Sequence, residues 1–539
     1  MAFLLQLPIL WFCLFSVLCL TFTSGHVIPR FPVAAFKPDE PRSYSAKNAH
    51  YDTKFFTQIL DHFNYNPQSY ETFQQRYLIS DVYWGGAKNK APIFVYTGNE
   101  GDIELFANNT GFMFETAPHF KALLVFIEHR FYGKSMPFGG SIEVAYSNSS
   151  TLGYLSSTQA LADYATLIVD LKKNLSASDS PVVVFGGSYG GMLAAWFRMK
   201  YPHVATGALA SSAPILHFMD LVSSYAFNDV ITQDFKEESE NCYKVIKGSW
   251  KQIEDTAKRS DGLELLRKTF RICENCHISG SDIENWIMTA LMYTAMTDYP
   301  TRSDFLKPLP AYPVKKVSSK LMLICPQMKA EHAKWERWQM CEAIDSPEHG
   351  NDTFAKMYEA VNIYYNYTGT ATCFNLSDDS DSLGLDGWQW QACTEMIMPT
   401  EGSDEESIFP AYEWSYQDTA AFCNSIYSIV PRPYWISTEF GGHGIQEVLR
   451  TAASNIIFFN GLRDPWSAGG VSTNISDTII ALVAKQGAHH VDLRFSSEED
   501  DPQWLKDIRR QEVDIISTWI SRHYQQIVRP ASSSSISDI

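Results

Sequence analysis

Residues 186–190 form a G-x-S-x-G pattern with Ser188 at its centre. An apolar run, Val182 to Phe185, precedes it, and an apolar stretch with helical spacing, Met192 to Tyr201, follows it. A nucleophilic serine on a tight strand-to-helix turn requires small neighbours, because a Cβ there would meet the strand or the helix. The pattern therefore predicts Ser188 as a nucleophile, with the Tyr189 N–H as one donor to a developing oxyanion.

A serine attacks well only when a base removes its proton, and a histidine oriented by a carboxylate does this in many hydrolases. Asp464 lies in a turn after an apolar run, Asn455 to Phe459, and is the candidate acid. Between it and the C-terminal helical stretch the only histidines are His489 and His490, and one of them should be the base. His523 lies on a helical pattern near the chain end and is expected to be a surface residue.

The elements that would position these residues alternate between strand and helix. Short apolar runs rich in β-branched and aromatic residues are typical of buried parallel strands, and Thr158 to Leu175 between two of them has helical spacing. The predicted strands are Ile93 to Tyr96, Leu123 to Ile127, Val182 to Phe185, Gly207 to Ala210 and Asn455 to Phe459. Together with the order Ser, Asp, His along the chain, this alternation predicts an α/β-hydrolase fold.

The stretch after Pro214 is charged and has helical patterning, for example Ser281–Glu284, which we interpret as a capping box that opens an apolar run through Met296. Strand patterning returns clearly only at Asn455. We therefore expect a hydrolase core in two parts, residues 49–214 and 441–528, separated by a mostly helical cap at 215–440. A Ser-rich tail, 529–539, follows.

The N-terminus predicts entry into the secretory pathway. Leu4 to Phe22 is apolar and uncharged and is followed by small residues, which indicates a signal peptide over 1–25, with an uncleaved membrane anchor as the alternative. Residues 26–48 are expected to be a removable propeptide or a plain N-terminal extension. The destination, either outside the cell or in a vacuole or lysosome, is left open. Glycosylation sequons occur at Asn108, Asn148, Asn174, Asn351, Asn366, Asn375 and Asn474.

The cysteines beyond the signal peptide all fall between Cys242 and Cys423. In an oxidising compartment this clustering predicts a disulfide-stapled region. Cys273 and Cys276 form a C-x-x-C pair, but no second pair follows, so neither a metal site nor another cofactor is expected.

Asp and Glu total 61 against 43 Lys and Arg, a formal charge of -18, which disfavours binding to nucleic acid or to an anionic membrane. Hydrophobic residues make up 45% of the chain, enough for a large core and a second unit.

Several longer segments are similar to one known family. They are Tyr96–Ile103, Asn108–Met113, Glu128–Arg130, Gly186–Pro202, Gln391–Glu395 and Gly487–Arg494. These segments resemble the serine peptidases that include lysosomal Pro-X carboxypeptidase and dipeptidyl peptidase II, and the likeness runs from about Tyr51 to Tyr524. It implies a triad of Ser188, Asp464 and His489 and a cap over the active site. It also implies disulfides between Cys242 and Cys341, Cys273 and Cys373, and Cys393 and Cys423.

One segment departs from that family. Val317 to about Gln339 looks like extra sequence between Pro313 and Cys341 relative to the family's spacing. Cys325, which lies in it, and Cys276 are left without an implied partner.

The family contains two activities that need opposite charges beside the scissile bond. A carboxypeptidase binds the substrate carboxylate with a cation, which His490 and Arg494 could supply, or the two could support the loop. The alternative is release of an N-terminal dipeptide, which needs an anion for the ammonium group. The region where that branch carries an acidic anchor corresponds to Asn366–Cys373 and holds no Asp or Glu. We therefore favour a carboxypeptidase that cleaves after proline. A catalytically silent peptide-binding protein remains a further alternative.

A second oxyanion donor is expected from the loop Gly98–Gly101, where Gly98 and Gly101 would allow close backbone approach. Candidate walls of a proline pocket are Trp466, Met192, Trp388 and Trp390. The expected partners are peptides with a penultimate proline, with no nucleic acid and no membrane once the signal is removed. A homodimer is kept as an option.

Overall fold

The structure is a computed structural model that describes residues 50–315, 339–376, 386–403 and 405–528. The predicted signal peptide and propeptide lie outside these residues. So do the Ser-rich tail and the sequence from Val317 to residue 338, with Cys325.

An eight-stranded sheet forms the centre of the core, with strand order β1-β2-β4-β3-β5-β6-β7-β8. β1 and β2 pair antiparallel, β2 also pairs antiparallel with β4, and all later neighbours run parallel. The strands are β1 (Asp52–Ile59), β2 (Thr72–Ser80), β3 (Ile93–Thr97), β4 (Leu123–Ile127), β5 (Val182–Gly187), β6 (Gly207–Ser211), β7 (Ile456–Gly461) and β8 (Ile479–Ala484). This topology is that of an α/β hydrolase, so the predicted fold class is confirmed.

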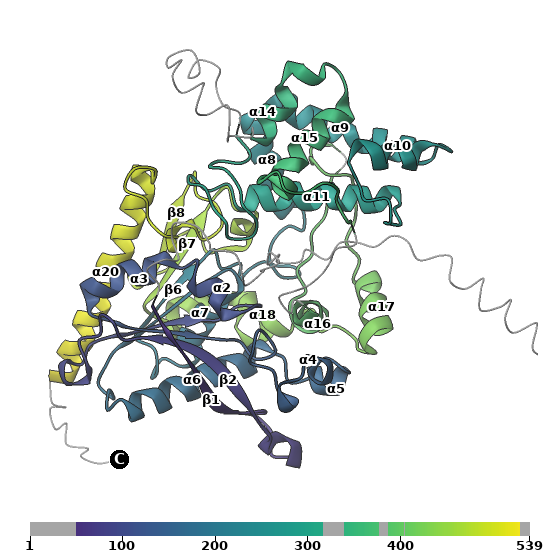
Figure 1. Ribbon diagram of the computed structural model, residues 1–539. Helices are drawn as coiled ribbons and strands as arrows, with labels where there is room; N and C mark the ends of the chain where they lie inside the picture. The colour runs from purple at the N-terminus through teal and green to yellow at the C-terminus, as the bar shows by residue number, and fades with distance from the viewer. Residues whose placement is uncertain (1–49, 316–338, 377–385, 404, 529–539) are drawn as a thin grey trace, which may run out of the picture. The chain divides into compact units, whose positions relative to one another are not determined.

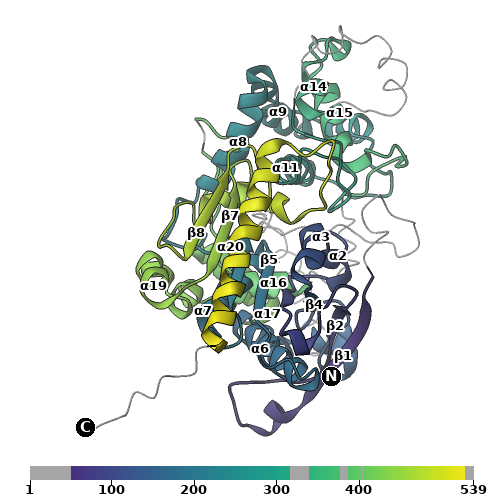
Figure 2. The ribbon, with the colours of Figure 1, turned by 90° about the vertical axis from the view of Figure 1, so that its left-hand side faces the viewer.

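Helices cover both faces of this sheet (Figures 1 and 2). α6 (Ser157–Asn174) and α7 (Tyr189–Lys200) pack together on one face, and α3 (Gly111–Phe120) and α20 (Gln503–Val528) pack together on the other. The five strands predicted from sequence are all buried and match β3 to β7 within two residues at each end. Shorter helices in the core are α2 (Ile103–Ala107), α4 (Ile142–Ala145) and α5 (Ser149–Leu152).

Between β6 and β7 the described chain is helical. Its elements are α8 (Ala226–Glu238), α9 (Glu240–Ala257), α10 (Gly262–Thr269), α11 (Gly280–Met296), α14 (Met340–Asp345), α15 (Thr353–Asn366), α16 (Asp386–Thr394), α17 (Tyr416–Tyr427), α18 (Trp435–Glu439) and α19 (Ile445–Ala452). The helices from α8 to α15 gather into one bundle, which we call the cap (Figure 1). Disulfides join Cys242 to Cys341, Cys273 to Cys373 and Cys393 to Cys423, the pairs that the family resemblance implied.

The N-terminus of α11 differs in detail from the prediction. Its capping box is formed by Ser279 and Asp282, two residues earlier than the predicted Ser281 and Glu284. Both spacings fit the pattern, but the Ser279 backbone is extended, as a capping residue requires, and its side chain accepts the Asp282 N–H.

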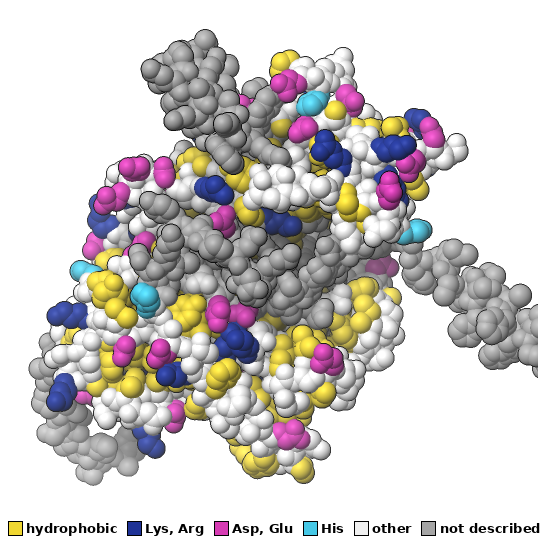
Figure 3. All heavy atoms as spheres, viewed as in Figure 1, with side chains coloured by type: hydrophobic (Ala, Val, Ile, Leu, Met, Phe, Trp, Pro, Cys, Tyr) yellow, Lys and Arg dark blue, Asp and Glu magenta, His cyan; other side chains and the backbone are white. Residues whose placement is uncertain are grey.

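Within the described residues, none of the helices combines the length and the apolar character needed to cross a bilayer. On the face shown in Figure 3, basic side chains are interspersed with acidic ones over both the core and the cap.

Candidate active site

Ser188 lies between β5 and α7 in a backbone conformation that only a tight turn imposes, with φ 61° and ψ -129°. The flanking glycines are required, because a Cβ on Gly186 would lie 2.0 Å from the Gly190 carbonyl oxygen and one on Gly190 would lie 2.2 Å from the Asn99 side chain. The Ser188 N–H donates to the Ser211 carbonyl at 3.0 Å, which ties the turn to β6. Its hydroxyl oxygen is buried and makes no hydrogen bond within the described structure.

His489 and Asp464 form a buried pair. The Nδ1 atom of His489 lies 2.7 Å from the Oδ2 atom of Asp464. The other carboxylate oxygen of Asp464 accepts the Trp466 N–H at 3.1 Å and caps a 3-10 turn (Pro465–Gly469) after β7. Since Asp464 occupies Nδ1, the Nε2 atom of His489 is the one left to act on a neighbouring hydroxyl.

The sheet brings these residues to one edge. β5, β6, β7 and β8 are parallel neighbours in that order, and Ser188, Asp464 and His489 follow the carboxyl ends of β5, β7 and β8. A Cβ on Gly187 would lie 2.9 Å from the His490 ring, and the ring centroids of His490 and His489 are 4.2 Å apart. The His489 loop therefore lies against the turn that carries Ser188.

His490 cannot provide the cation that the sequence suggested. Burial, together with the positive charge of Arg494, holds its pKa well below the ordinary value, so the imidazole is neutral. The guanidinium next to it belongs to Arg494. One of its Nη atoms bonds His490, the other donates to the Asn109 carbonyl, and the guanidinium lies 3.8 Å from the centre of the Phe305 ring.

Two predicted oxyanion donors are already used elsewhere. The Gly98 N–H donates to the Ile127 carbonyl at 3.0 Å as a continuation of the β3–β4 pairing, so the assignment to Gly98 is wrong. The Gly101 N–H donates to the Asn99 carbonyl at 3.0 Å. In the same loop the Asn99 side chain donates to the Gly187 carbonyl at 2.7 Å, which places the Asn99 backbone beside the nucleophile turn. The Tyr189 N–H lies at the first position of α7, where helix N–H groups have no partner in the helix.

A buried polar network lies behind Tyr189 that sequence reasoning did not assign. The Tyr189 hydroxyl lies 3.1 Å from His129 Nε2 and accepts the Gln391 amide at 2.9 Å. Gln391 also accepts the Tyr132 hydroxyl at 2.6 Å and donates to Glu395 at 3.0 Å. The sequence signals were the family-like segments Glu128–Arg130 and Gln391–Glu395 and the i, i+4 spacing of Gln391 and Glu395. Through this network α16 packs on the hydrolase core.

The Glu100 carboxyl, in the loop after β3, was also not assigned. It is buried, one of its oxygens has no hydrogen-bond partner in the described structure, and burial raises its pKa to about 8.

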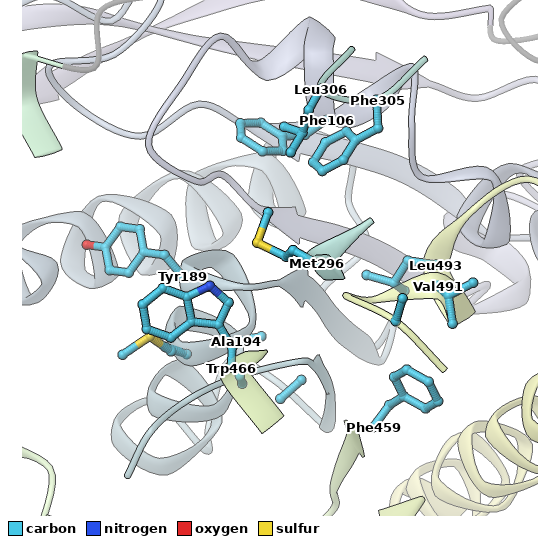
Figure 4. Close-up of a cluster of buried hydrophobic side chains, with 14 of the residues drawn as sticks. Phe106, Tyr189, Ala194, Met296, Phe305, Leu306, Phe459, Trp466, Val491 and Leu493 are labelled. Carbon is cyan, nitrogen blue, oxygen red and sulfur yellow. The ribbon is translucent and has the colours of Figure 1, made fainter. Parts of the chain in front are cut away.

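The predicted pocket walls have different surroundings. Trp466 packs edge-on against Phe227 of the cap at 4.6 Å, and Trp388 packs edge-on against Tyr189 at 5.4 Å. Met192, on α7, belongs to the same buried cluster. Trp390 instead lies in a second, separate cluster around Tyr132, so it is a core residue. Figure 4 shows Trp466 and Tyr189 of the core with Met296 and Phe305 of the cap.

One predicted glycosylation site is buried. The Asn366 side chain bonds Asn362 and the backbone of Ala371 and is buried, which argues against a glycan at this sequon. The exposed sequon asparagines are Asn148, Asn174, Asn351, Asn375 and Asn474, and Asn108 is half-buried. Cys276 is buried, has no disulfide partner among the described residues, and lies 3.0 Å from the Asn375 side chain.

The chain is similar to known proteins over most of its length. Residues 58–512 match the family model for serine carboxypeptidase S28. Lysosomal Pro-X carboxypeptidase from Homo sapiens is 40% identical over 90% of this chain and 92% of its own length, and the Bos taurus protein is 42% identical over 88% and 89%. Prolyl carboxy peptidase like protein 5 from Caenorhabditis elegans is 36% identical over 83% and 86%.

Among solved structures, proline iminopeptidase from Mycobacterium smegmatis aligns with 88% of this chain and 100% of its own, at 10% identity and a TM-score of 0.35. The family model spans most of the chain, and the two mammalian relatives are identical to this chain at about two fifths of the aligned positions, over about nine tenths of their own length. The protein is therefore an enzyme, a serine peptidase that belongs to the serine carboxypeptidase S28 family.

Proposed function

We propose that this peptidase releases the C-terminal residue of peptides in which that residue follows proline, through an acyl-enzyme on Ser188. The observation that carries the proposal is the 2.7 Å contact between His489 and Asp464, on the same sheet edge as the strained turn of Ser188. Three relatives named above, from mammals and from Caenorhabditis elegans, carry Pro-X or prolyl carboxypeptidase names, which supports the choice of substrate class.

In the proposed reaction, His489 Nε2 takes the Ser188 hydroxyl proton while the serine oxygen bonds to the proline carbonyl carbon. The carbonyl oxygen becomes an oxyanion that the Tyr189 N–H and the Asn99 N–H stabilise. His489 then gives its proton to the leaving amine, the C–N bond breaks, and the free amino acid departs. Water, deprotonated by His489, hydrolyses the ester and restores Ser188. Asp464 keeps the imidazole in the required tautomer and stabilises its charged form.

Arg494 is the proposed anchor for the substrate carboxylate. Its contacts in the described part of the chain are an imidazole, a backbone carbonyl and the rings of Phe305 and Tyr299, none of which neutralises its charge. A guanidinium that is half-buried and lacks a counter-ion attracts a carboxylate strongly. It bonds His490, the neighbour of the proposed base His489, which supports a role in binding the terminal carboxylate of a substrate at Ser188.

The apolar walls for proline are proposed to be Trp466 and Trp388. Both indoles are packed edge-on against other rings, and a rigid aromatic wall fits the flat pyrrolidine ring with little loss of side-chain freedom.

The compartment is proposed to be the secretory pathway, ending in a vacuole or lysosome or outside the cell. The three disulfides and the lysosomal names of the mammalian relatives support it. A homodimer stays a prediction, which light scattering of the purified enzyme would test.

Peptides with blocked ends test the proposed activity. An N-acetylated peptide that ends in Pro-Phe should lose phenylalanine, and the same peptide with a C-terminal amide should be cleaved far more slowly, because Arg494 then has no carboxylate to bind. The products are read by mass, with Ser188→Ala as the inactive control. Release of an N-terminal dipeptide from an unblocked peptide, without cleavage of the acetylated one, would contradict the proposal and support dipeptidyl peptidase activity. Failure of a fluorophosphonate to label Ser188 would support a silent binding protein.

A further inference from the structure

The end of α11 holds the loop that carries His489. The His489 N–H donates to the Met296 carbonyl at 3.0 Å, and the Tyr299 hydroxyl donates to the His489 carbonyl at 3.0 Å. Both backbone polar groups of His489 are therefore bonded to one short cap segment, Met296–Tyr299, which we call the brace. Burial raises the pKa of Tyr299 to about 12, so its hydroxyl stays a donor throughout the range in which the enzyme works.

The brace also reaches the loop that carries Asp464. Arg463, directly before it, places its Nε atom 3.4 Å from the Asp298 carboxylate of the brace. The same guanidinium lies 3.5 Å from Asp234 and 2.8 Å from Glu238, both on α8. The backbone N–H of Arg463 donates to the carbonyl of Gly487, in the loop that carries His489, at 3.0 Å. One arginine thus joins both catalytic loops to three cap carboxylates.

The side chains that make these contacts are buried or nearly buried, so they have little freedom to move apart. Asp298 is fully buried and also accepts the Val314 N–H at 3.1 Å, while Asp234 is buried and Arg463 is 15% exposed. The nearby charges that act on this cluster are those of Glu237, Lys315 and Asp464. A buried charge that loses its partner is costly, so the cap cannot move away from Arg463 without a large penalty.

We propose that the brace and Arg463 are positioning residues that hold His489 and Asp464 in line for proton transfer from Ser188. The inference rests on the proposed triad and goes beyond it, because it makes the cap part of the catalytic geometry rather than only a cover over the substrate. Proton transfer in such a triad depends on alignment, and small displacements lower the rate steeply.

Two variants test this, with one matched control. Tyr299→Phe removes the hydroxyl that donates to His489 and keeps the ring that packs against Arg494. Arg463→Gln removes the charge that joins the Asp464 loop to the cap. Tyr365→Phe is the control, because its hydroxyl donates to the Trp286 carbonyl at 2.8 Å inside the cap and away from the triad. Melting temperature, kcat and KM for an N-acetylated Pro-Phe peptide, and the rate of fluorophosphonate labelling are measured for each.

The positioning role predicts that Tyr299→Phe lowers kcat and the labelling rate by about tenfold to a hundredfold with little change in KM. Tyr365→Phe should lose comparable stability and keep the wild-type kcat. Arg463→Gln should behave as Tyr299→Phe does, and Arg463→Lys should recover part of the loss. If Tyr299→Phe and Arg463→Gln keep the wild-type kcat and labelling rate, or change only KM, the proposal is wrong.

The same measurements separate this failure from failure of the proposed function. If wild-type enzyme does not cleave the acetylated peptide, or if Ser188→Ala cleaves it as fast as wild type, the triad assignment itself fails. If wild-type enzyme cleaves the acetylated peptide and only the brace variants lack the expected effect, the triad assignment holds and the positioning role of the brace is wrong.

Discussion

The imidazole of His489 and the carboxylate of Asp464 lie 2.7 Å apart although they follow different strands, β8 and β7, and the loops that carry them both contact one segment of the cap, Met296–Tyr299. Their pairing therefore depends on the register of the sheet and on the cap together. The following predictions test that dependence and the chemistry it serves.

Replacing Asp464 with Asn should abolish activity and leave the fold intact. The amide cannot accept the Nδ1–H in the way a carboxylate does, so the imidazole loses both its tautomer preference and its stabilising charge; we expect kcat to fall by about 10⁴-fold. Asp477→Asn, an exposed aspartate just before β8, is the control and should keep wild-type kcat. Circular dichroism checks the fold, and comparable kcat for both variants would contradict the role of Asp464.

Gly187→Ala should disturb the histidine loop from the side of the nucleophile turn. The added methyl group would lie 2.9 Å from two atoms of the His490 ring, so His490 and the neighbouring His489 must shift. We expect kcat/KM to fall by about 100-fold. Gly248→Ala, on α9 with open space around it, should not change kcat/KM and should stabilise the helix slightly. Equal kinetics for the two variants would show that the His490 contact with the turn does not matter.

The protein should be more stable at pH 5 than at pH 8. Burial raises the pKa of several carboxyl groups above their ordinary values, so the folded chain holds protons that the unfolded chain releases, and stability falls as the pH rises through this interval. The groups without a cationic partner at the carboxyl are Glu100, raised to about 8, and Glu395, raised to about 7, and Asp492 is raised to about 6.

Buried histidines act in the opposite sense. Burial lowers the pKa of His129 and His217 to about 4, so the unfolded chain binds more protons than the folded chain below pH 6.5, and stability falls with acidification there. His490 acts in the same sense as these two histidines. The histidine effect ends near pH 6.5, whereas the raised carboxyl pKa values act up to about pH 8, so the melting temperature at pH 5 should exceed that at pH 8 by about 2 to 5 °C. Glu395→Gln should reduce the difference, and a melting temperature that rises from pH 5 to pH 8 would contradict this account.

Glycans should be found at the exposed sequons and not at Asn366. The Asn366 side chain is bonded on both its amide nitrogen and its carbonyl oxygen within the cap, and a glycan there would break those bonds. Enzymatic deglycosylation in heavy-oxygen water, followed by peptide mass analysis, marks each occupied asparagine. Occupancy at Asn366 in active enzyme would contradict the packing described for α15.

The sequence predicts β3 to β7 well because strands covered on both faces are continuous apolar runs. Neither β1 nor β2 is a continuous apolar run. In the edge strand β1 only Gln58 is buried, and in β2 buried and exposed residues largely alternate. β8 has only half of its residues buried. Ser188 could be found from local spacing, since the turn itself dictates the glycines around it.

Other parts of the site depend on tertiary contacts that no local pattern carries. The hydrogen bond between Gln391 and Tyr189 joins residues about two hundred positions apart in the sequence, and the bond between Tyr299 and His489 spans a similar separation. The neutral state of His490 follows from its burial beside Arg494. The Gly98 N–H donates to Ile127 at the end of β4, so it is not available to an oxyanion. Each of these could be judged only once the cap and the sheet were placed together.

Trapping the acyl-enzyme tests the central claim most directly. Wild-type enzyme mixed with an N-acetylated Pro-Phe peptide and quenched in acid within milliseconds should yield a Ser188 peptide heavier by the acetylated segment that ends in proline, with one phenylalanine released for each acyl group formed. Rapid turnover with no such adduct at Ser188, or with the adduct on another residue, would contradict the account.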